Sequence, residues 1–249
     1  MLKFFRRIRH KLLDEGNLNR YMLYAIGEIL LVVVGILIAL QLNNWNEERN
    51  AKNFEKKLLT EIHYTLTNDL GQWNRGIQKT ERIIESLNIL SNHMENDLMY
   101  HDSLDIHFGN AKDWFIQLIN ESAYQTAKTY GLHFMENDTT RLLLSRFYEE
   151  DLKWIRTMES RQHDYHFMTV VPMLTENFNS ILGWKSDHSS YSITPRNYEE
   201  LKENIEFKSM VNTNLENRKR DIYFFKLFRE FLIDIKNRLE TEIRNMNKN

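Results

Sequence analysis

Histidine and acidic side chains are the groups in this sequence that could carry chemistry. His163 and His166 stand three residues apart with Asp164 between them. A second group consists of His101, Asp102 and His107. A zinc site needs three or four ligands that converge in space, and neither group has a spacing such as His-Glu-x-x-His. We therefore interpret these histidines as solvated or hydrogen-bonded residues, and we predict no metal site and no bound cofactor.

Other patterns that indicate catalysis or nucleic-acid binding are missing from the sequence. It has no cysteine, so it offers no disulfide, no thiolate nucleophile and no thiolate metal ligand. It contains neither a Gly-rich phosphate loop nor a Gly-x-Ser-x-Gly elbow, and adjacent acids such as Glu149 and Glu150 diverge on a helix. The net charge of -2 gives no bias toward nucleic acid. We predict that the chain is not an enzyme and binds no nucleic acid.

The composition favours long helices. Only 8 Gly and 2 Pro occur in 249 residues, so the chain lacks the residues that sheets and tight turns require. We therefore predict an all-α fold.

Residues 21–42 form a run that is long and apolar enough to span a membrane. The run is YMLYAIGEILLVVVGILIALQL, and its one ionisable residue is Glu28. As a helix that rises about 1.5 Å per residue it covers about 30 Å, the thickness of the hydrocarbon core. A buried core helix and a cleaved signal peptide are the alternatives. The run is long for a signal peptide and no small-x-small cleavage site follows it, so we predict an uncleaved transmembrane helix.

Basic residues are concentrated before this run, whereas acidic and basic residues are mixed after it. An excess of lysine and arginine keeps the N-terminal side in the cytosol. This predicts a cytosolic basic tail at residues 1–20, a transmembrane helix at 21–42 and an exported domain at 43–249. The tail is predicted to lie on the anionic membrane surface as a short helix, with a disordered tail as the alternative. The residues predicted to make this membrane-surface contact are Lys3, Arg6, Arg7, Arg9 and Lys11.

Glu28 requires a hydrogen-bond partner or a path for its side chain to the membrane surface, because transfer of a carboxylate into hydrocarbon costs free energy. At about 100° per residue, Gly35 and Ala39 lie about 20° to either side of Glu28, and Ala25 lies about 60° away. Small residues allow two helices to approach closely, and a polar side chain can bond across the contact. We predict that these residues form a helix–helix interface that makes the chain a homo-oligomer. A Glu28 that extends to the cytosolic surface, or one that handles ions or protons, is the alternative.

Two stretches of the sequence resemble a known family. The opening MLKFFRRIRHKLL and the following YAIGEILLVVVGILIALQLNNWNEER resemble the uncharacterised Bacteroidota family called domain of unknown function 6090. The resemblance continues more weakly through SAYQTAKTYGL at 122–132, although such relatives often have LKxSG where this chain has AKTYG. It implies a single-span inner-membrane protein of an envelope with two membranes, and hence a periplasmic domain. It implies no activity, because the family has none assigned.

The exported domain begins with a helical pattern. Apolar residues recur at spacings of three, four and seven up to about residue 91, which predicts a first long helix. Gly71 and Gly76 weaken this helix without ending it. A polar turn is predicted at 92–103, followed by a second helix at about 104–130 that ends at Gly131 as a left-handed cap.

A third helix is predicted to begin with Asn137 or the next residue as its cap and to kink or break at Pro172. Residues 183–196 then form the clearest predicted loop in the chain. Trp184 and Tyr191 fall in this loop, where recognition surfaces tend to lie.

The last elements are a short helix around 197–205 and a long one at about 208–245. Apolar residues cover more than half of the circumference of the long helix, so we predict that it sits centrally among the others. Together these elements predict one N-terminal transmembrane helix followed by an elongated antiparallel helical bundle.

These features favour a membrane-anchored interaction or scaffold protein of the envelope, which self-associates and binds the lipid bilayer and an unknown envelope protein partner. The alternatives are an envelope ligand sensor that acts through a separate partner, an enzyme of unrecognised type, or an ion-handling oligomer built around Glu28.

Overall fold

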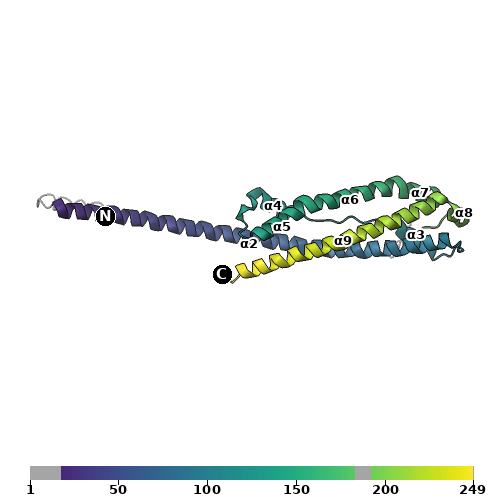
Figure 1. Cartoon of the computed structure of the whole chain (residues 1–249), viewed down its shortest axis with the longest axis horizontal. Helices are drawn as coiled ribbons and strands as arrows, with labels where there is room; N and C mark the ends of the chain where they lie inside the picture. Colours follow the sequence, from purple (N-terminus) through teal and green to yellow (C-terminus); the bar gives the residue numbers. More distant parts are fainter. Residues whose placement is uncertain (1–17, 183–191, 249) are drawn as a thin grey trace. The chain divides into compact units, whose positions relative to one another are not determined.

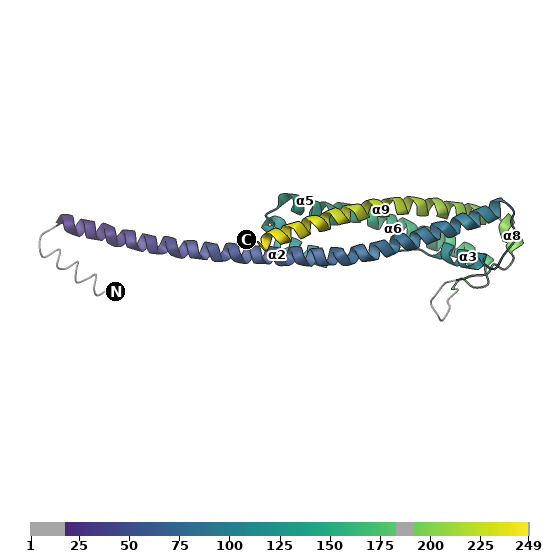
Figure 2. The ribbon, with the colours of Figure 1, turned by 90° about the horizontal axis from the view of Figure 1, so that it is seen from below.

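The computed structural model describes residues 18–182 and 192–248, and it divides into unit 1, Met1–Glu55, and unit 2, Lys56–Asn249. Helix α2, Leu18–Glu95, begins in unit 1 and ends in unit 2. The other helices of unit 2 are α3 (Leu104–Lys112), α4 (Ser122–Tyr130), η1 (Leu132–Phe134), α5 (Asp138–Arg146), η2 (Phe147–Asp151), α6 (Leu152–Tyr165), η3 (His166–Val170), α7 (Val171–Asn177), α8 (Tyr198–Glu203) and α9 (Ile205–Met246). Within unit 2, the second part of α2, the run from α5 to α7, and α9 lie side by side (Figures 1 and 2).

Contacts between α2 and α9 show that the two helices run in opposite directions. Trp73 Nε1 donates to Phe225 O at 2.8 Å, and Ser91 Oγ donates to Asn212 Oδ1 at 2.7 Å, so residue numbers rise along one helix as they fall along the other. In the described residues the only strand-type pairing is an isolated bridge between Phe178 and Pro195. The predicted all-α class, with a long N-terminal apolar helix followed by an antiparallel helical bundle, is therefore confirmed.

Unit 2 has a core of its own. At the end where α2 stops, a buried cluster joins α2, α3, α7 and α9, and its largest rings are Phe108, Phe178 and Phe207. Nearer the middle of unit 2, Trp73 and Phe147 are fully buried as well. The burial of these side chains supplies the main free energy that holds the helices together.

The segment between α3 and α4 is extended, so the prediction of one helix over 104–130 was wrong. After α3 ends, Gln117 and Ile119 are buried while Ile116 and Leu118 are exposed, which is the alternation of a strand. The backbone N–H of Gln117 donates to Glu159 Oε1 at 2.6 Å, which links the segment to α6. The N–H of Asn120 donates to Asp69 Oδ2 at 3.0 Å, so two acidic side chains accept backbone hydrogen bonds from the segment.

This extended segment crosses α2 at Gly76. A Cβ atom at Gly76 would lie 2.4 Å from Phe115 Cε1 and 2.6 Å from Gln117 Nε2, whereas one at Gly71 would meet only Arg75 Nη1, at 3.9 Å. Gly76 therefore allows the segment to approach the helix closely, and Gly71 has no such role.

The ends of the helices follow the sequence closely. Asn137 Oδ1 accepts hydrogen bonds from the N–H groups of Thr139 at 3.0 Å and Thr140 at 3.2 Å, as predicted for the cap of the third helix. Gly131 is the C-cap of α4, as predicted, with a positive φ of 89°, but its ψ of 118° lies outside the left-handed helical region. α2 ends at Glu95, inside the polar turn predicted at 92–103.

Pro172 does not break the third helix, so of the predicted kink or break the break was wrong. The helix continues through it to Asn177, and a π turn, His166–Val170, comes directly before α7. We attribute the continuity to this wider turn, which relieves the contact between the proline ring and the preceding carbonyl.

α9 is buried on one face only, which corrects the prediction that it sits centrally. Phe225, Leu232 and Leu239 are buried, but Tyr223 and Leu227 are 65% and 54% exposed. α9 has more apolar residues than its one buried face can hold, and the others lie at the surface.

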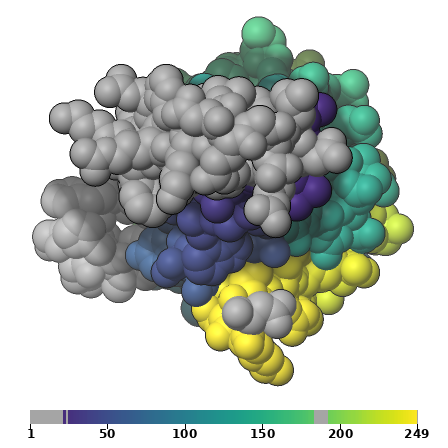
Figure 3. Space-filling view, turned by 90° about the vertical axis from the view of Figure 1, so that its left-hand side faces the viewer, coloured from purple at the N-terminus to yellow at the C-terminus, as the bar shows by residue number. Residues whose placement is uncertain are grey.

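The last turns of α9 lie beside the start of α5 (Figure 3). Thr140 Oγ1 and Asn137 Nδ2 both donate to Glu242 Oε2, at 2.5 and 3.2 Å. Burial raises the pKa of Glu242 despite these two hydrogen bonds. The contact fixes the third helix of the bundle to the end of α9.

Candidate functional site

The apolar part of α2 in unit 1 is exposed along its length. Within residues 25–42 its large apolar side chains are all at least 44% exposed, and α2 is the one helix among the described residues that is long and apolar enough to cross a membrane. An exposed apolar surface of this length is typical of a transmembrane helix. The basic residues predicted to contact the membrane surface, Lys3, Arg6, Arg7, Arg9 and Lys11, lie outside the described residues.

The predicted helix–helix interface lies on this segment. Gly35 and Ala39 are exposed, Glu28 and Ala25 are half-buried, and a Cβ atom at Gly35 would meet nothing within 4 Å. The four residues belong to one helix with the spacing that the prediction used. Their role as an interface stays a prediction.

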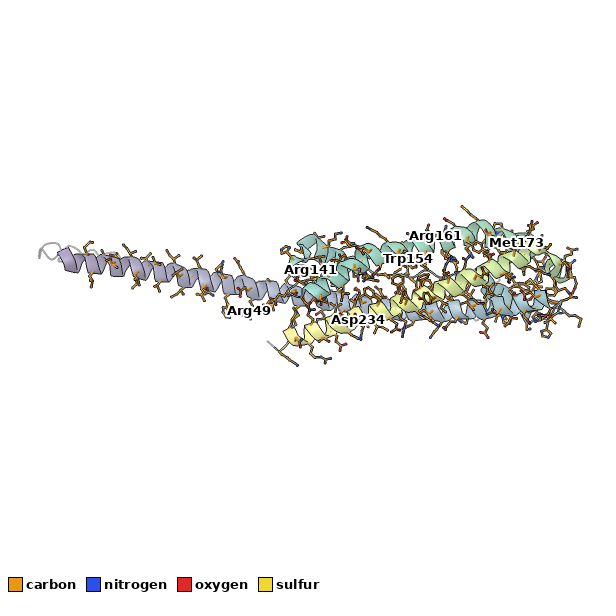
Figure 4. All side chains as sticks on the ribbon, in the orientation of Figure 1. Arg49, Arg141, Trp154, Arg161, Met173 and Asp234 are labelled. Carbon is orange, nitrogen blue, oxygen red and sulfur yellow. The ribbon has the colours of Figure 1, made fainter. Side chains whose placement is uncertain are left out.

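A second exposed apolar surface lies on unit 2, where α6 and α9 meet. We call it the aromatic face and define it by Trp154 on α6 and by Phe224, Leu227 and Phe228 on α9. The ring centroid of Trp154 lies 4.5 Å from that of Phe224 and 5.5 Å from that of Phe228, so the rings form one continuous surface. Trp154 is 41% exposed and Leu227 is 54% exposed. Figure 4 shows Trp154 between the ribbons of the two helices.

Two arginines mark one end of the aromatic face. Arg161 follows Trp154 by seven residues and Arg220 precedes Leu227 by seven, so each points within about 20° of the apolar residue on its own helix. Gln162, the residue after Arg161, donates through Nε2 to Oδ1 of Asp221, the residue after Arg220, at 3.0 Å. The two arginines therefore lie on neighbouring turns of the two helices. Arg161 and Arg220 are both exposed.

Beneath this end, a layer of polar side chains is buried between α6 and α9. It consists of Gln162, His166, Asn214, Arg218 and Asp221, each at most 7% exposed. Arg218 Nη1 lies 3.8 Å from Asp221 Oδ2, and Asn214 Nδ2 donates to Ala111 O at 3.1 Å. Because a buried charge is costly without a partner, this layer requires α6, α9 and the end of α3 to stay together.

Burial determines the protonation of this layer. Burial, reinforced by the neighbouring Arg218, lowers the pKa of His166 to about 4, so its ring is neutral at neutral pH. Burial raises the pKa of Asp221 to about 6, although Arg218 and Arg220 act in the opposite direction. The pKa of His166 is thus lowered and that of Asp221 raised, and both changes fall between about pH 4 and 6.5.

The histidines singled out in the sequence have ordinary structural partners. His166 stacks on Trp114 with ring centroids 5.6 Å apart, and His163 meets the same ring edge-on at 5.5 Å. His107 Nδ1 lies 3.1 Å from Ser86 Oγ, and His101 Nδ1 lies 3.0 Å from Ser103 Oγ. Over residues 18–182 and 192–248, no three His, Asp or Glu side chains are placed to hold a metal ion.

The sequence alone did not reveal the aromatic face. Trp184 and Tyr191, the aromatic residues predicted for recognition, lie outside the described residues. The available signal was the excess of apolar residues on α9, which the sequence analysis assigned to a central position.

A family model matches part of the chain. No curated protein and no solved structure matches the chain. As the resemblance of the sequence predicts, residues 28–126 match the model of a family of unknown function, DUF6090.

Proposed function

We propose that this chain is a single-pass membrane protein whose unit 2 is an interaction domain on the far side of the cytoplasmic membrane. The exposed apolar surface between Ala25 and Leu42 carries the proposal. About 18 residues of exposed apolar helix would be strongly unfavourable in water but are well matched to the hydrocarbon core.

The charges on either side of this segment support its orientation. Lysine and arginine dominate residues 1–20, and residues 43–57 mix them with glutamate. Basic flanks stay in the cytosol, so unit 2 is exported. In an envelope with two membranes, unit 2 then lies in the periplasm.

The proposed role of unit 2 is to hold other proteins at the membrane. It has its own buried core, and it displays the aromatic face to solvent. Contiguous exposed apolar surfaces on soluble units mark sites of association.

Extraction of membranes from cells that make the intact chain tests the anchor. Alkaline carbonate, which releases peripheral proteins, should leave the chain in the membrane pellet, and detergent should release it. A variant in which Leu30, Val33 and Ile36 are replaced by Lys should lose this retention, because each lysine near the middle of the span costs about 3 kcal/mol. Release of the unchanged chain by carbonate would contradict the proposal.

We further propose that the span self-associates through Glu28, Gly35 and Ala39. A hydrogen bond between helices in a membrane contributes about 0.6–2 kcal/mol, so Glu28→Gln should largely keep the association. Gly35→Leu should weaken it more, because added bulk separates the two backbones. Gly27→Leu is a matched control, since Gly27 also has open space around it but lies about 100° from Glu28.

A membrane two-hybrid assay of the intact chain can rank these variants. Equal association of Gly35→Leu and Gly27→Leu would show that the stripe is not an interface. If Glu28→Gln keeps the association but abolishes function in the cell, the ionisation of Glu28 matters and the ion-handling alternative gains support.

A further inference from the structure

The aromatic face has the composition of a protein-binding surface. Trp154, Phe224 and Phe228 are in ring contact, and Leu227 adds an exposed aliphatic group beside them. Tryptophan and other large aromatic residues contribute much of the binding energy at protein interfaces, because they bury a large area at little cost in conformational entropy. The face lies along two antiparallel helices, so its long axis suits a third helix laid beside them.

The charges around the aromatic face indicate what kind of helix it would accept. At one end the Arg220 side chain is 53% exposed, whereas its nearest carboxylate, Asp221 at 3.8 Å, is 2% exposed. At the other end Arg146 is 63% exposed and Asp151, 3.7 Å away, is 19% exposed. At these two points of the rim the guanidinium groups are therefore more exposed than the carboxylates beside them.

Arg146 also reaches the apolar surface directly. Its guanidinium carbon lies 5.6 Å from the ring centroid of Phe231, one turn beyond Leu227 on α9. Arginine forms bidentate hydrogen bonds with carboxylates, so arginines beside aromatic rings favour a partner that combines apolar and acidic side chains.

A second copy of the chain fits this surface poorly. If two aromatic faces pair with their helices parallel, the two-fold axis exchanges α6 and α9, so Arg220 of one copy lies against Arg161 of the other. Like charges set opposite one another oppose the association of two copies in this arrangement.

The geometry points to the aromatic face as a docking site for an amphipathic helix of another protein, whose apolar side chains are flanked by carboxylates that meet Arg161 and Arg220. This inference rests on the proposed interaction role of unit 2 and names the chemistry of the partner. The apolar contact supplies most of the affinity, and the arginines select the partner and its direction.

Site-specific photocrosslinking of the intact chain in native membranes tests this inference. A photoreactive phenylalanine in place of the exposed Leu227 should give a discrete adduct heavier than the chain. The double reversal Arg161→Glu/Arg220→Glu should reduce the adduct about tenfold, the change expected for about 1.4 kcal/mol. The matched control is Lys153→Glu/Lys219→Glu, which makes the same charge change at exposed positions of the same two helices about 100° away. The control should keep the adduct.

The identity of the adduct completes the test. Mass spectrometry should place the crosslink in a helical segment with Asp or Glu within about two turns, and Lys at that acid should restore the adduct in the reversed variant. The inference is overturned by an adduct with twice the mass of the chain, by a partner segment without acidic residues, by equal loss in both double variants, or by the absence of an adduct. Melting temperatures of the purified double variants exclude loss of the fold as the cause. Retention of the chain in carbonate-washed membranes is independent of all these outcomes, so failure here leaves the proposed anchor intact.

Discussion

Gly76 offers a sharp test of how unit 2 is assembled. In an exposed helix, replacement of glycine by alanine stabilises the fold by about 1 kcal/mol, because alanine has the higher helix propensity. Gly71→Ala should show this gain, since its new methyl group meets only Arg75 Nη1 at 3.9 Å. Gly76→Ala places its methyl group 2.4 Å from Phe115 Cε1 and 2.6 Å from Gln117 Nε2, so the extended segment must move.

The size of the effect follows from the balance of these terms. Overpacking of a well-filled site costs about 1–3 kcal/mol. The gain in helix propensity is common to both variants, so Gly76→Ala should be less stable than Gly71→Ala by about 1–3 kcal/mol. For a unit of this size, that difference corresponds to about 3–10 °C in melting temperature.

Thermal unfolding of the intact chain in detergent, followed by circular dichroism, measures this difference. Gly76→Ala should cost less stability in a Phe115→Ala background than in the parent, because the ring that obstructs the new methyl group is gone. If Gly76→Ala is as stable as Gly71→Ala, the segment does not cross α2 at Gly76 and the packing described here is wrong.

Two further predictions concern unit 2. Residues 56–249 made alone should be soluble, strongly helical and cooperative in unfolding, because the buried core lies within this unit; a circular dichroism spectrum of a disordered chain would mean that the bundle is completed by something else. The His166→Gln variant tests the buried polar layer through pH. The folded-state pKa of His166, about 4, lies below the unfolded value of 6.5, so the folded state binds fewer protons in that range and loses stability as the pH falls through it. Between pH 7 and pH 5 the parent should therefore lose up to about 2 kcal/mol more than His166→Gln. Asp221→Asn should have the opposite effect and lose more stability than the parent on acidification, because the raised pKa of Asp221, about 6, stabilises the folded parent as the pH falls. Denaturant titrations at pH 7 and pH 5 measure these losses. If both variants lost more stability than the parent, or both lost less, the account would be contradicted.

The long helices could be predicted because each has a clear signal in the sequence. The apolar spacing of the second part of α2 and the side chain of Asn137 act locally, so they identify a helix and its first residue without knowledge of the fold. The signal for a candidate membrane-spanning helix is equally local, since it consists of length and apolar composition.

The extended segment at 113–121 was missed because helical patterns on both sides obscured a short alternation. Ile116 and Leu118 face outward while Gln117 and Ile119 face inward, and β-branched and aromatic residues make up much of the stretch. The prediction that Gly76 does not end the helix was correct, but the reason for a glycine there, the close approach of Phe115, depends on a contact between distant parts of the chain.

The aromatic face could not be separated from the core by sequence. Phe225 is buried and Leu227 is exposed, yet both are apolar residues of the same long helix. Periodicity gives the direction of each side chain around the helix axis, but it does not say which directions other helices cover. The partners of Arg218 and His166 are hidden for the same reason, because α6 and α9 are distant in sequence.

The orientation of the chain in the membrane is the central claim, and a reporter fused after Asn249 tests it most directly. A reporter enzyme that is active only outside the cytosol should be active at this site, and one that is active only in the cytosol should be silent. The positive flank at residues 1–20 predicts this pair of results. Activity of the cytosolic reporter after Asn249, with silence of the other, would place unit 2 inside the cell and contradict the account.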